Sequence, residues 1–324
     1  MRSRGPAGSS PLKKLVPGPV RKAGREVLRR AGVHSNGAVT VSVEEALRTL
    51  EQRWTIPTAV DDPIFIFATG WRSGSTLLQR LVMSSGKALI WGEPYPRMGY
   101  VRQLSKSLQA LSGGWPPDRW ILDAASDGSQ PDLWQSWVAN LMPPPAQLVE
   151  AHRAFLRQLY APPASAGPGM RWGFKEVRYG MEQARYLHWL FPKAQFLFLH
   201  RSPYEAYRSY RSWHLGSYES WPDRPIWTPD AFGQMWRRLA QGFVQEGEAM
   251  GGMVVAYDGL TTDAGATSRI GAHLGLELDA AALALRIDGR QEGAEPLAPV
   301  PAGELRSLRR AVEPLAGSLG YRPE

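Results

Sequence analysis

Residues 63–85 of this 324-residue chain constrain its fold more than any other stretch. An apolar run from Ile64 to Ala68 predicts a buried strand, and the apolar side chains of 77–82 recur at helical spacing. Between them lies the loop Gly70-Trp71-Arg72-Ser73-Gly74-Ser75-Thr76. A strand, a glycine loop and a helix in this order form an anion cradle, because loop N–H groups and the positive end of the helix dipole point at one place. The stretch therefore predicts a phosphate-binding loop.

The loop carries its own donors and departs from the pattern of nucleoside triphosphate enzymes. Arg72 supplies a permanent charge, and Ser73, Ser75 and Thr76 supply hydroxyl groups. A Walker A loop has four residues between its glycines followed by Lys, whereas three residues separate Gly70 from Gly74 and Ser75 follows. The sequence thus favours a phosphate group outside a triphosphate. The alternative is a glycine- and serine-containing turn that binds nothing.

Further apolar runs and periodic segments alternate along the chain. Short strands are predicted at 88–91, 171–175, 195–199 and 253–256. Helices are predicted over 43–54, where Ser42 and Glu45 form a capping box, over 181–190, from about 204, and over 230–248. Strands alternating with helices indicate an α/β fold, with a central parallel sheet flanked by helices.

Several charged residues follow these strands directly. Glu93 comes after the second strand, Lys175 ends the third, and Arg201 comes after the fourth. Because ligands of open parallel sheets bind beyond the carboxyl ends of the strands, we expect these residues to converge with the loop at 70–76. The sequence predicts one site at that edge.

Composition and charge place limits on the rest of the chain. A hydrophobic content of 43% and a charged content of 21% fit a globular protein, and we expect one domain over 41–324 with lid or acceptor-pocket segments at 95–165 and 213–229. Cysteine is absent, which suits a reducing compartment, and we expect a cytoplasmic location. No apolar run has the length of a membrane span or a signal peptide.

The net charge of +8 is confined to the first 30 residues, which hold nine basic side chains and one acidic one. The remainder is neutral, so we do not expect the body to bind nucleic acid. Residues 1–40 predict a disordered basic arm. Within it, 20–31 could form a basic helix that contacts a membrane surface or a partner, and a solvated tail is the alternative.

Two motifs together resemble those of the sulfotransferases that use 3′-phosphoadenosine 5′-phosphosulfate (PAPS). The loop at 70–77 is similar to the family's 5′-phosphosulfate loop in the branch that carries Arg-Ser-Gly-Ser, with Trp71 in place of a common proline. The segment 198–210 is similar to the family's 3′-phosphate segment, in which an arginine at a strand end precedes a serine by eight residues. Arg201 and Ser209 keep that spacing, and Ser202 stands where Asp is usual.

A third stretch extends the resemblance to residues 63–321. The segment Tyr257-Asp258-Gly259-Leu260, the later His273-Leu274-Gly275-Leu276 and the closing Leu319-Gly320-Tyr321 look like the family's C-terminal pattern. The resemblance implies a P-loop-like sulfotransferase architecture with a helical lid insertion, PAPS as co-substrate and a hydroxylated small-molecule or lipid-like acceptor. It also implies donor contacts from Arg72, Ser73, Gly74, Ser75, Thr76, Arg201, Ser209, Tyr257 and Arg290.

Sulfuryl transfer by in-line attack needs a base for the acceptor hydroxyl. In relatives with arginine in the first loop, a Glu in a Gly-Glu segment is the base, and Glu93 matches it. The alternative for Glu93 is a carboxylate at a helix N-terminus. His214 and His200 are rival bases, with His200 expected to be structural at its strand end.

Charge on the transferred and leaving groups also needs stabilisation. The resemblance gives Arg72 a contact with the transferring sulfate and Lys175 a contact with the leaving group. Relatives often continue from that lysine with Thr/Asp-Pro, whereas Glu176-Val177 follows here. A Lys175–Glu176 ion pair on the surface is the alternative.

The acceptor site is the least defined part of the sequence. The chain has 13 tryptophans, most of which we expect in packing, but Trp213 and Trp221, with His214 and Trp227, fall in one loop that could line an apolar acceptor pocket. We expect no metal, because the histidines are scattered and the carboxylates lack ligand spacing.

Two other functions remain open on the sequence. A P-loop nucleotide kinase would need the absent Walker lysine and a Mg²⁺-binding acid. A non-enzymatic nucleotide-binding protein on an α/β scaffold is the second alternative.

Overall fold

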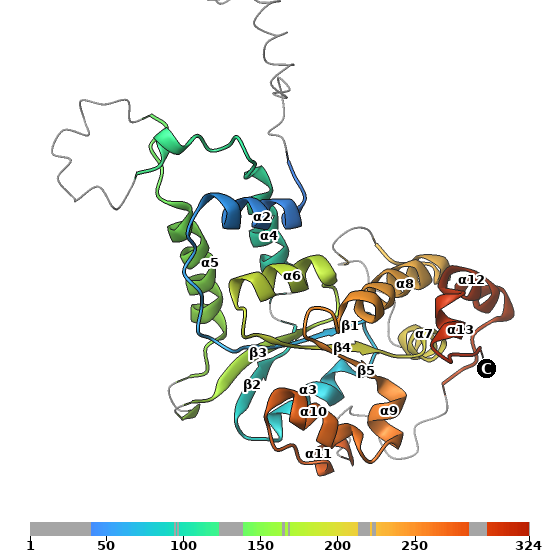
Figure 1. Ribbon diagram of the computed structural model, residues 1–324. Coiled ribbons are helices and arrows are strands. Elements are labelled where there is room, and N and C mark those ends of the chain that lie inside the picture. Colours follow the sequence, from blue (N-terminus) through green and yellow to red (C-terminus); the bar gives the residue numbers. More distant parts are fainter. Residues whose placement is uncertain are drawn as a thin grey trace, which may run out of the picture.

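The computed structural model of the chain describes residues 40–93, 95, 97–122, 139–163, 166–167, 169–212, 221, 225–284 and 297–323 (Figure 1). The predicted basic arm, apart from residue 40, lies outside these residues. So do three predicted site residues, Trp213, His214 and Arg290.

A five-stranded parallel sheet forms the centre of the molecule, as the sequence predicts. The strands are β1 (Ile64–Ala68), β2 (Ala88–Trp91), β3 (Arg171–Glu176), β4 (Gln195–His200) and β5 (Met253–Ala256). Their order is β2-β3-β1-β4-β5, so β1 is central and the loop that follows it lies between the ends of β3 and β4. Both of those strands run one residue beyond the prediction, to Glu176 and His200, whose side chains are buried.

Helices connect the strands and cover both faces of the sheet (Figure 1). They are α2 (Val43–Arg53), α3 (Ser75–Met83), α4 (Tyr100–Ser107), α5 (Pro145–Tyr160), α6 (Met181–Leu190), α7 (Pro203–Arg211), α8 (Pro229–Glu246), α9 (Tyr257–Thr262), α10 (Ala266–Leu274), α11 (Ala281–Ala284), α12 (Ala302–Val312) and α13 (Leu315–Ser318). Helix α2 begins at the predicted cap, where the Ser42 hydroxyl accepts a hydrogen bond from the Glu45 amide at 3.1 Å.

Side chains of the central strands alternate between two hydrophobic cores. Phe65 and Phe67 of β1 point into the core shared with α2, α4, α5, α6 and α8, whereas Ile64 and Ile66 point into the core shared with α3 and α10. The period of two along a strand produces this division, because successive side chains lie on opposite faces. Strand β4 repeats the pattern, with Phe196 and Phe198 on one face and leucines on the other.

The described parts of the predicted insertion at 95–165 belong to the first of these cores. Val101 of α4, with Val149 and Leu156 of α5, is buried there. Helices α4 and α5 therefore hold the covering layer of the sheet in place beside β2 and β3.

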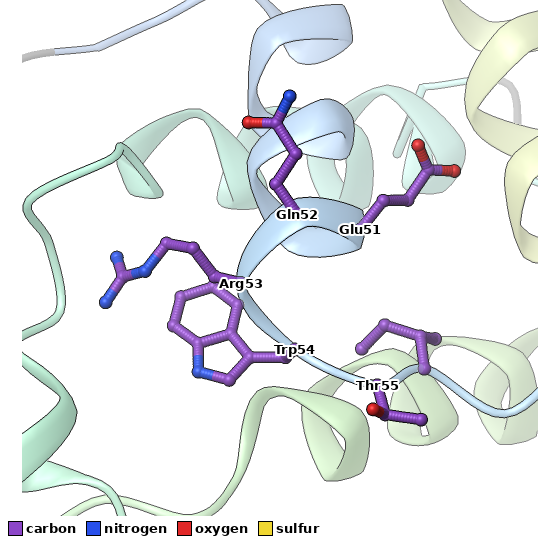
Figure 2. A pocket seen from close by; sticks show the side chains of 6 residues that line it. Glu51, Gln52, Arg53, Trp54 and Thr55 are labelled. Carbon is purple, nitrogen blue, oxygen red and sulfur yellow. The ribbon is translucent and has the colours of Figure 1, made fainter.

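A surface pocket at the end of α2 lies away from the carboxyl ends of the strands. Residues 51–56 line it, and Figure 2 shows that their side chains spread in different directions. Glu51 accepts a hydrogen bond at 2.9 Å from Trp189 Nε1, which lies near the end of α6, just before β4 begins. Arg53 donates to the Ser112 and Pro116 carbonyls and to Asp118. This pocket has no convergent set of donors that would hold a charged ligand.

Candidate active site

The loop after β1 has the backbone of an anion-binding nest. Gly70, Arg72 and Gly74 have φ angles of 96°, 65° and 87°, so every second residue is in the left-handed region. Ser73 between them is fully buried and donates its hydroxyl to the Gly70 carbonyl at 2.8 Å. Alternation of left- and right-handed residues turns successive N–H groups toward one concavity. A positive φ at Arg72, which is not glycine, is costly and occurs most often at functional sites.

The end of this loop is the start of α3. Gly74 caps α3 and has no side chain that could bond to the first amides, and the first turn carries no acidic residue. Ser75 is buried and Thr76 is exposed. A Cβ at position 74 would lie 2.2 Å from the ring of Tyr257, so only glycine allows this ring to pack against the loop. The unneutralised end of α3 thus favours an anion beside Tyr257.

Arg201 at the end of β4 is held from several sides. Its Nη1 donates to the Arg72 carbonyl at 3.1 Å, and its guanidinium lies 4.2 Å from the centre of the Tyr257 ring. Nη2 and Nε both donate to Glu205 Oε2, at 2.7 and 3.2 Å. Glu205 was not predicted as a site residue from the sequence. Its position one helical turn after Arg201 in α7 is the signal that could have indicated it.

Ser209 lies one further turn along α7 and is 6% exposed. Its hydroxyl accepts a hydrogen bond from Arg72 Nε at 2.9 Å. The predicted 5′-phosphosulfate loop and the predicted 3′-phosphate segment are therefore in direct contact, through Arg72–Ser209 and Arg201–Arg72. An anion that binds to Arg72, Arg201 or Ser209 competes with these two hydrogen bonds.

Glu93 lies beside the same loop. Its carboxylate accepts hydrogen bonds from Trp71 Nε1 at 2.8 Å, Lys175 Nζ at 2.5 Å and Arg178 Nη2 at 3.2 Å. The Glu93 side chain is 18% exposed and that of Lys175 8%. The structure thus brings Glu93 and Lys175 together with the loop at 70–76, as expected at the carboxyl edge.

These contacts exclude two of the alternatives. Lys175 does not form a surface pair with Glu176; both residues are buried, and Lys175 pairs with Glu93. The carboxylate of Glu93 precedes α4, which begins at Tyr100, and its partners are side chains. The predicted Lys175–Glu176 surface pair is wrong because Lys175 pairs instead with Glu93, which lies 82 positions away in the sequence.

Arg178 and Glu176 extend this cluster. Arg178 was not predicted as a site residue from the sequence. Arg178 is 2% exposed and donates to Glu176 through Nε at 2.8 Å and Nη2 at 2.9 Å. Burial raises the pKa of the Glu176 carboxyl above its usual value, and the charge of Arg178 opposes that rise. Arg178 also lies 5.4 Å from the Trp71 ring centre. Its position two residues beyond the end of β3 is the signal from which Arg178 could have been predicted.

Trp221 and Trp227, the two described tryptophans of the predicted acceptor loop, differ in their exposure to solvent. Trp221 is 4% exposed and packs edge-to-face on Trp71, with ring centres 5.6 Å apart. Trp227 is 64% exposed. Trp221 therefore packs against Trp71, the loop residue that donates a hydrogen bond to Glu93.

An exposed aromatic row begins two residues after Glu93 and ends on α5. Tyr95, Tyr100 and Phe155 pack edge-to-face in series, with ring centres 5.6 and 5.5 Å apart. Tyr95 is 58% exposed and Phe155 42%. Burial raises the pKa of the nearby Tyr160, and the charge of Glu176 adds to that rise. The row of Tyr95, Tyr100 and Phe155 is an exposed aromatic surface.

His200, one of the rival bases, has a structural environment. It is buried at the end of β4, and its Nδ1 lies 2.7 Å from the Tyr321 hydroxyl. Burial lowers its pKa from 6.5 to about 4. A neutral, enclosed imidazole of this kind holds the C-terminal segment to the sheet.

We expect the stability of the protein to fall in acid because of His200. Its folded pKa lies below its unfolded value, so the unfolded chain binds more protons between pH 6.5 and about 4. The stabilisation is complete above pH 6.5 and is lost as the pH falls through this window. It should amount to on the order of 2–3 kcal/mol. Urea unfolding at pH 7 and pH 4 should show a smaller pH effect in His200→Gln, and an equal effect would contradict the assignment.

No group of three or more histidine or acidic side chains suited to a metal ion occurs within the described ranges. In the same part of the chain, no helix has the length and apolarity to cross a bilayer.

Comparison with known proteins decides the family. A model of the sulfotransferase family matches residues 63–280, which is most of the chain. The chain belongs to the sulfotransferase family. The matched region contains the loop, Glu93, Lys175, Arg201 and Tyr257, and membership makes this sulfotransferase a transferase of a sulfuryl group from a sulfonate donor to a small-molecule acceptor.

Two solved structures are also similar to this sulfotransferase. The sulfotransferase domain of the olefin synthase from Synechococcus PCC 7002 is 19% identical, with 83% of this chain and 99% of that chain covered and a TM-score of 0.43. The sulfotransferase domain from the curacin biosynthetic pathway is 15% identical, with 82% and 100% covered and a TM-score of 0.44. No curated protein matches. The family assignment thus depends on the family model.

Proposed function

We propose that this chain transfers the sulfuryl group of PAPS to a hydroxyl group of a small-molecule or lipid-like acceptor, with Glu93 as the base. One observation carries the proposal: a continuous set of contacts joins the candidate base to both candidate phosphate sites. Trp71 of the loop donates to Glu93, and the adjacent Arg72 contacts Ser209 and Arg201. A nucleotide with two phosphate groups, one of which carries the transferred sulfate, suits such an arrangement.

The donor would bind along the loop, Arg201 and α7. The nest at 70–76, with Ser73, Gly74, Ser75 and Thr76, suits the 5′-phosphosulfate, since its backbone donors face the start of α3. Arg201 and Ser209 suit the 3′-phosphate. Tyr257 would contact the nucleotide from beside Gly74. The role of Arg290 is proposed on the resemblance alone.

The chemistry divides among three side chains. The acceptor oxygen attacks sulfur in line, and the bond from sulfur to the bridging oxygen of the 5′-phosphate breaks. Glu93 takes the acceptor proton, while Lys175 and Arg72 stabilise negative charge on the leaving group and the transferring sulfate. In the pair Lys175–Glu93, Nζ of the cation lies 2.5 Å from Oε1 of the base. The proton acceptor and the cation that stabilises the leaving group thus lie side by side in the site.

We propose an acceptor with an apolar body, such as an aromatic or lipid-like alcohol. The exposed row of Tyr95, Tyr100 and Phe155 offers a surface for that body, and it begins two residues after Glu93 in the chain. Trp213, Trp221 and His214 remain proposed acceptor contacts, of which the buried Trp221 would act through Trp71.

We propose a single domain over residues 41–324 in a reducing compartment such as the cytoplasm, since the chain lacks cysteine. The basic arm carries the net charge and is available for contact with an anionic membrane surface.

Two measurements test the proposed function. Incubation with isotope-labelled PAPS and a panel of phenols, steroid-like alcohols and long-chain alcohols should give sulfated products detectable by mass. Thermal unfolding should shift upward with adenosine 3′,5′-bisphosphate in the absence of magnesium. A shift produced only by ATP with magnesium would instead support the nucleotide kinase, and nucleotide binding without transfer to any acceptor would support a binding protein.

A further inference from the structure

The two carboxylate oxygens of Glu93 have different partners. Oε2 accepts from Trp71 Nε1 at 2.8 Å and from Arg178 Nη2 at 3.2 Å. Oε1 accepts from Lys175 Nζ at 2.5 Å. A base needs one oxygen directed at the acceptor proton, so the difference between the two oxygens bears on which atom reacts.

The partners of Oε2 are fixed in place. Arg178 is 2% exposed, and Glu176, itself 4% exposed, binds both its Nε and its Nη2. Glu176 is fixed in turn by the Val177 amide, at 2.8 Å. The Trp71 ring lies 5.4 Å from the Arg178 guanidinium and 5.6 Å from the Trp221 ring. These ring contacts, together with the hydrogen bonds of Arg178 Nε and Nη2, leave the two donors little freedom.

The partner of Oε1 is of a different kind. A lysine ammonium is a compact charge on a flexible stem, and it can turn its three N–H donors toward a new anion. The charge of Arg178 is offset by Glu176, whereas that of Lys175 is offset by Glu93 alone among the ion pairs of the described residues. A developing negative charge on the leaving group therefore attracts Lys175 more than Arg178.

We propose that Trp71 and Arg178 are positioning residues that hold Oε2 of Glu93, and that Oε1 is the atom that receives the acceptor proton. This proposal rests on the role of Glu93 as base. As the donor reacts, Lys175 moves from Oε1 toward the bridging oxygen. The acceptor O–H bond breaks and its proton passes to Oε1, an oxygen–sulfur bond forms, and the electron pair of the broken sulfur–oxygen bond stays on the 5′-phosphate.

Trp71→Phe tests the proposal most directly, because it removes the indole N–H and keeps an aromatic ring. We expect kcat to fall about tenfold, the effect of one hydrogen bond to a charged group, while the acceptor KM and the dissociation constant of adenosine 3′,5′-bisphosphate change less than about twofold. Arg178→Lys should lower kcat at least as much. Unchanged kcat in Trp71→Phe overturns the proposal, even if Arg178→Lys does not fold.

The matched control is Arg153→Lys. Arg153 is 3% exposed and donates to the Leu190 and Pro57 carbonyls, far from Glu93 in the fold. This variant should lose stability and keep the kcat of the wild type. A similar kcat loss in Arg153→Lys would show that the Arg178→Lys effect is only structural.

A double-mutant cycle separates this proposal from the proposed function. In the Glu93→Gln background, Trp71→Phe should cause no further loss of kcat, because Trp71 acts through Glu93. A full tenfold loss in both backgrounds overturns the positioning role and leaves Glu93 as base. Full turnover in Glu93→Gln itself would instead overturn the base assignment.

Discussion

The Glu93→Gln variant is expected to lose about 10²- to 10⁴-fold in kcat, the usual contribution of a general base. The amide has nearly the same shape as the carboxylate and can still accept the Trp71 N–H, but it cannot take a proton. The affinity for adenosine 3′,5′-bisphosphate should remain within about threefold, because Glu93 contacts the loop through Trp71 and has no contact with Arg201 or Ser209. Single-turnover transfer from labelled PAPS measures the first quantity, and titration calorimetry measures the second.

Glu51→Gln is the matched control for this experiment. Glu51 also accepts a hydrogen bond from a tryptophan, Trp189 Nε1 at 2.9 Å, but it lies in the pocket at the end of α2. Its replacement should leave turnover unchanged. If Glu93→Gln keeps full turnover, the base is His214, and His214→Ala should then abolish transfer.

Arg201→Ala is expected to weaken binding of adenosine 3′,5′-bisphosphate by about 2–3 kcal/mol, or roughly 30- to 150-fold, since a buried phosphate loses a charge-assisted pair. The methyl group also leaves Glu205 without its partner and the Tyr257 ring without the guanidinium at 4.2 Å. Calorimetry with the bisphosphate gives the loss directly.

The nucleotide itself provides the sharpest control for Arg201. Adenosine 5′-phosphate lacks the 3′-phosphate, so its affinity should change much less in Arg201→Ala than that of the bisphosphate. Arg185→Ala removes an arginine that pairs with Glu246 on the surface and should affect neither ligand. Equal weakening of both nucleotides by Arg201→Ala would place Arg201 away from the 3′-phosphate.

Much of the fold could be predicted because its signals are local. The alternation of Phe65 and Phe67 with Ile64 and Ile66 indicates a strand buried on both faces, and the structure confirms it. The cap at Ser42 marks the start of α2. Boundaries differ by a residue or two, as at Glu176, because burial of a charged side chain against Arg178 depends on residues that local patterns do not include.

The partners within the site could not be predicted in the same way. Lys175 pairs with Glu93 across 82 positions, and Arg72 bonds to Ser209 across 137. Such contacts depend on the strand order, which brings the ends of β3, β1 and β4 side by side. The hydrogen bond from Arg178 to Glu93 could not be predicted for the same reason, because the residues adjacent to Arg178 in the sequence do not indicate it.

The parallel α/β sheet, the glycine loop before α3 and the residues at the carboxyl ends of the strands follow from the amino-acid sequence alone. Hydrophobic periodicity, glycine geometry and strand polarity act over a few residues and can be read from the chain directly. The partners of the polar side chains depend on the tertiary structure, which pairs Lys175 with Glu93, Glu176 with Arg178, and Arg72 with Ser209. Electrostatic pairing in a buried cluster depends on distances of a few ångströms between separate strands, and packing of the whole sheet sets those distances.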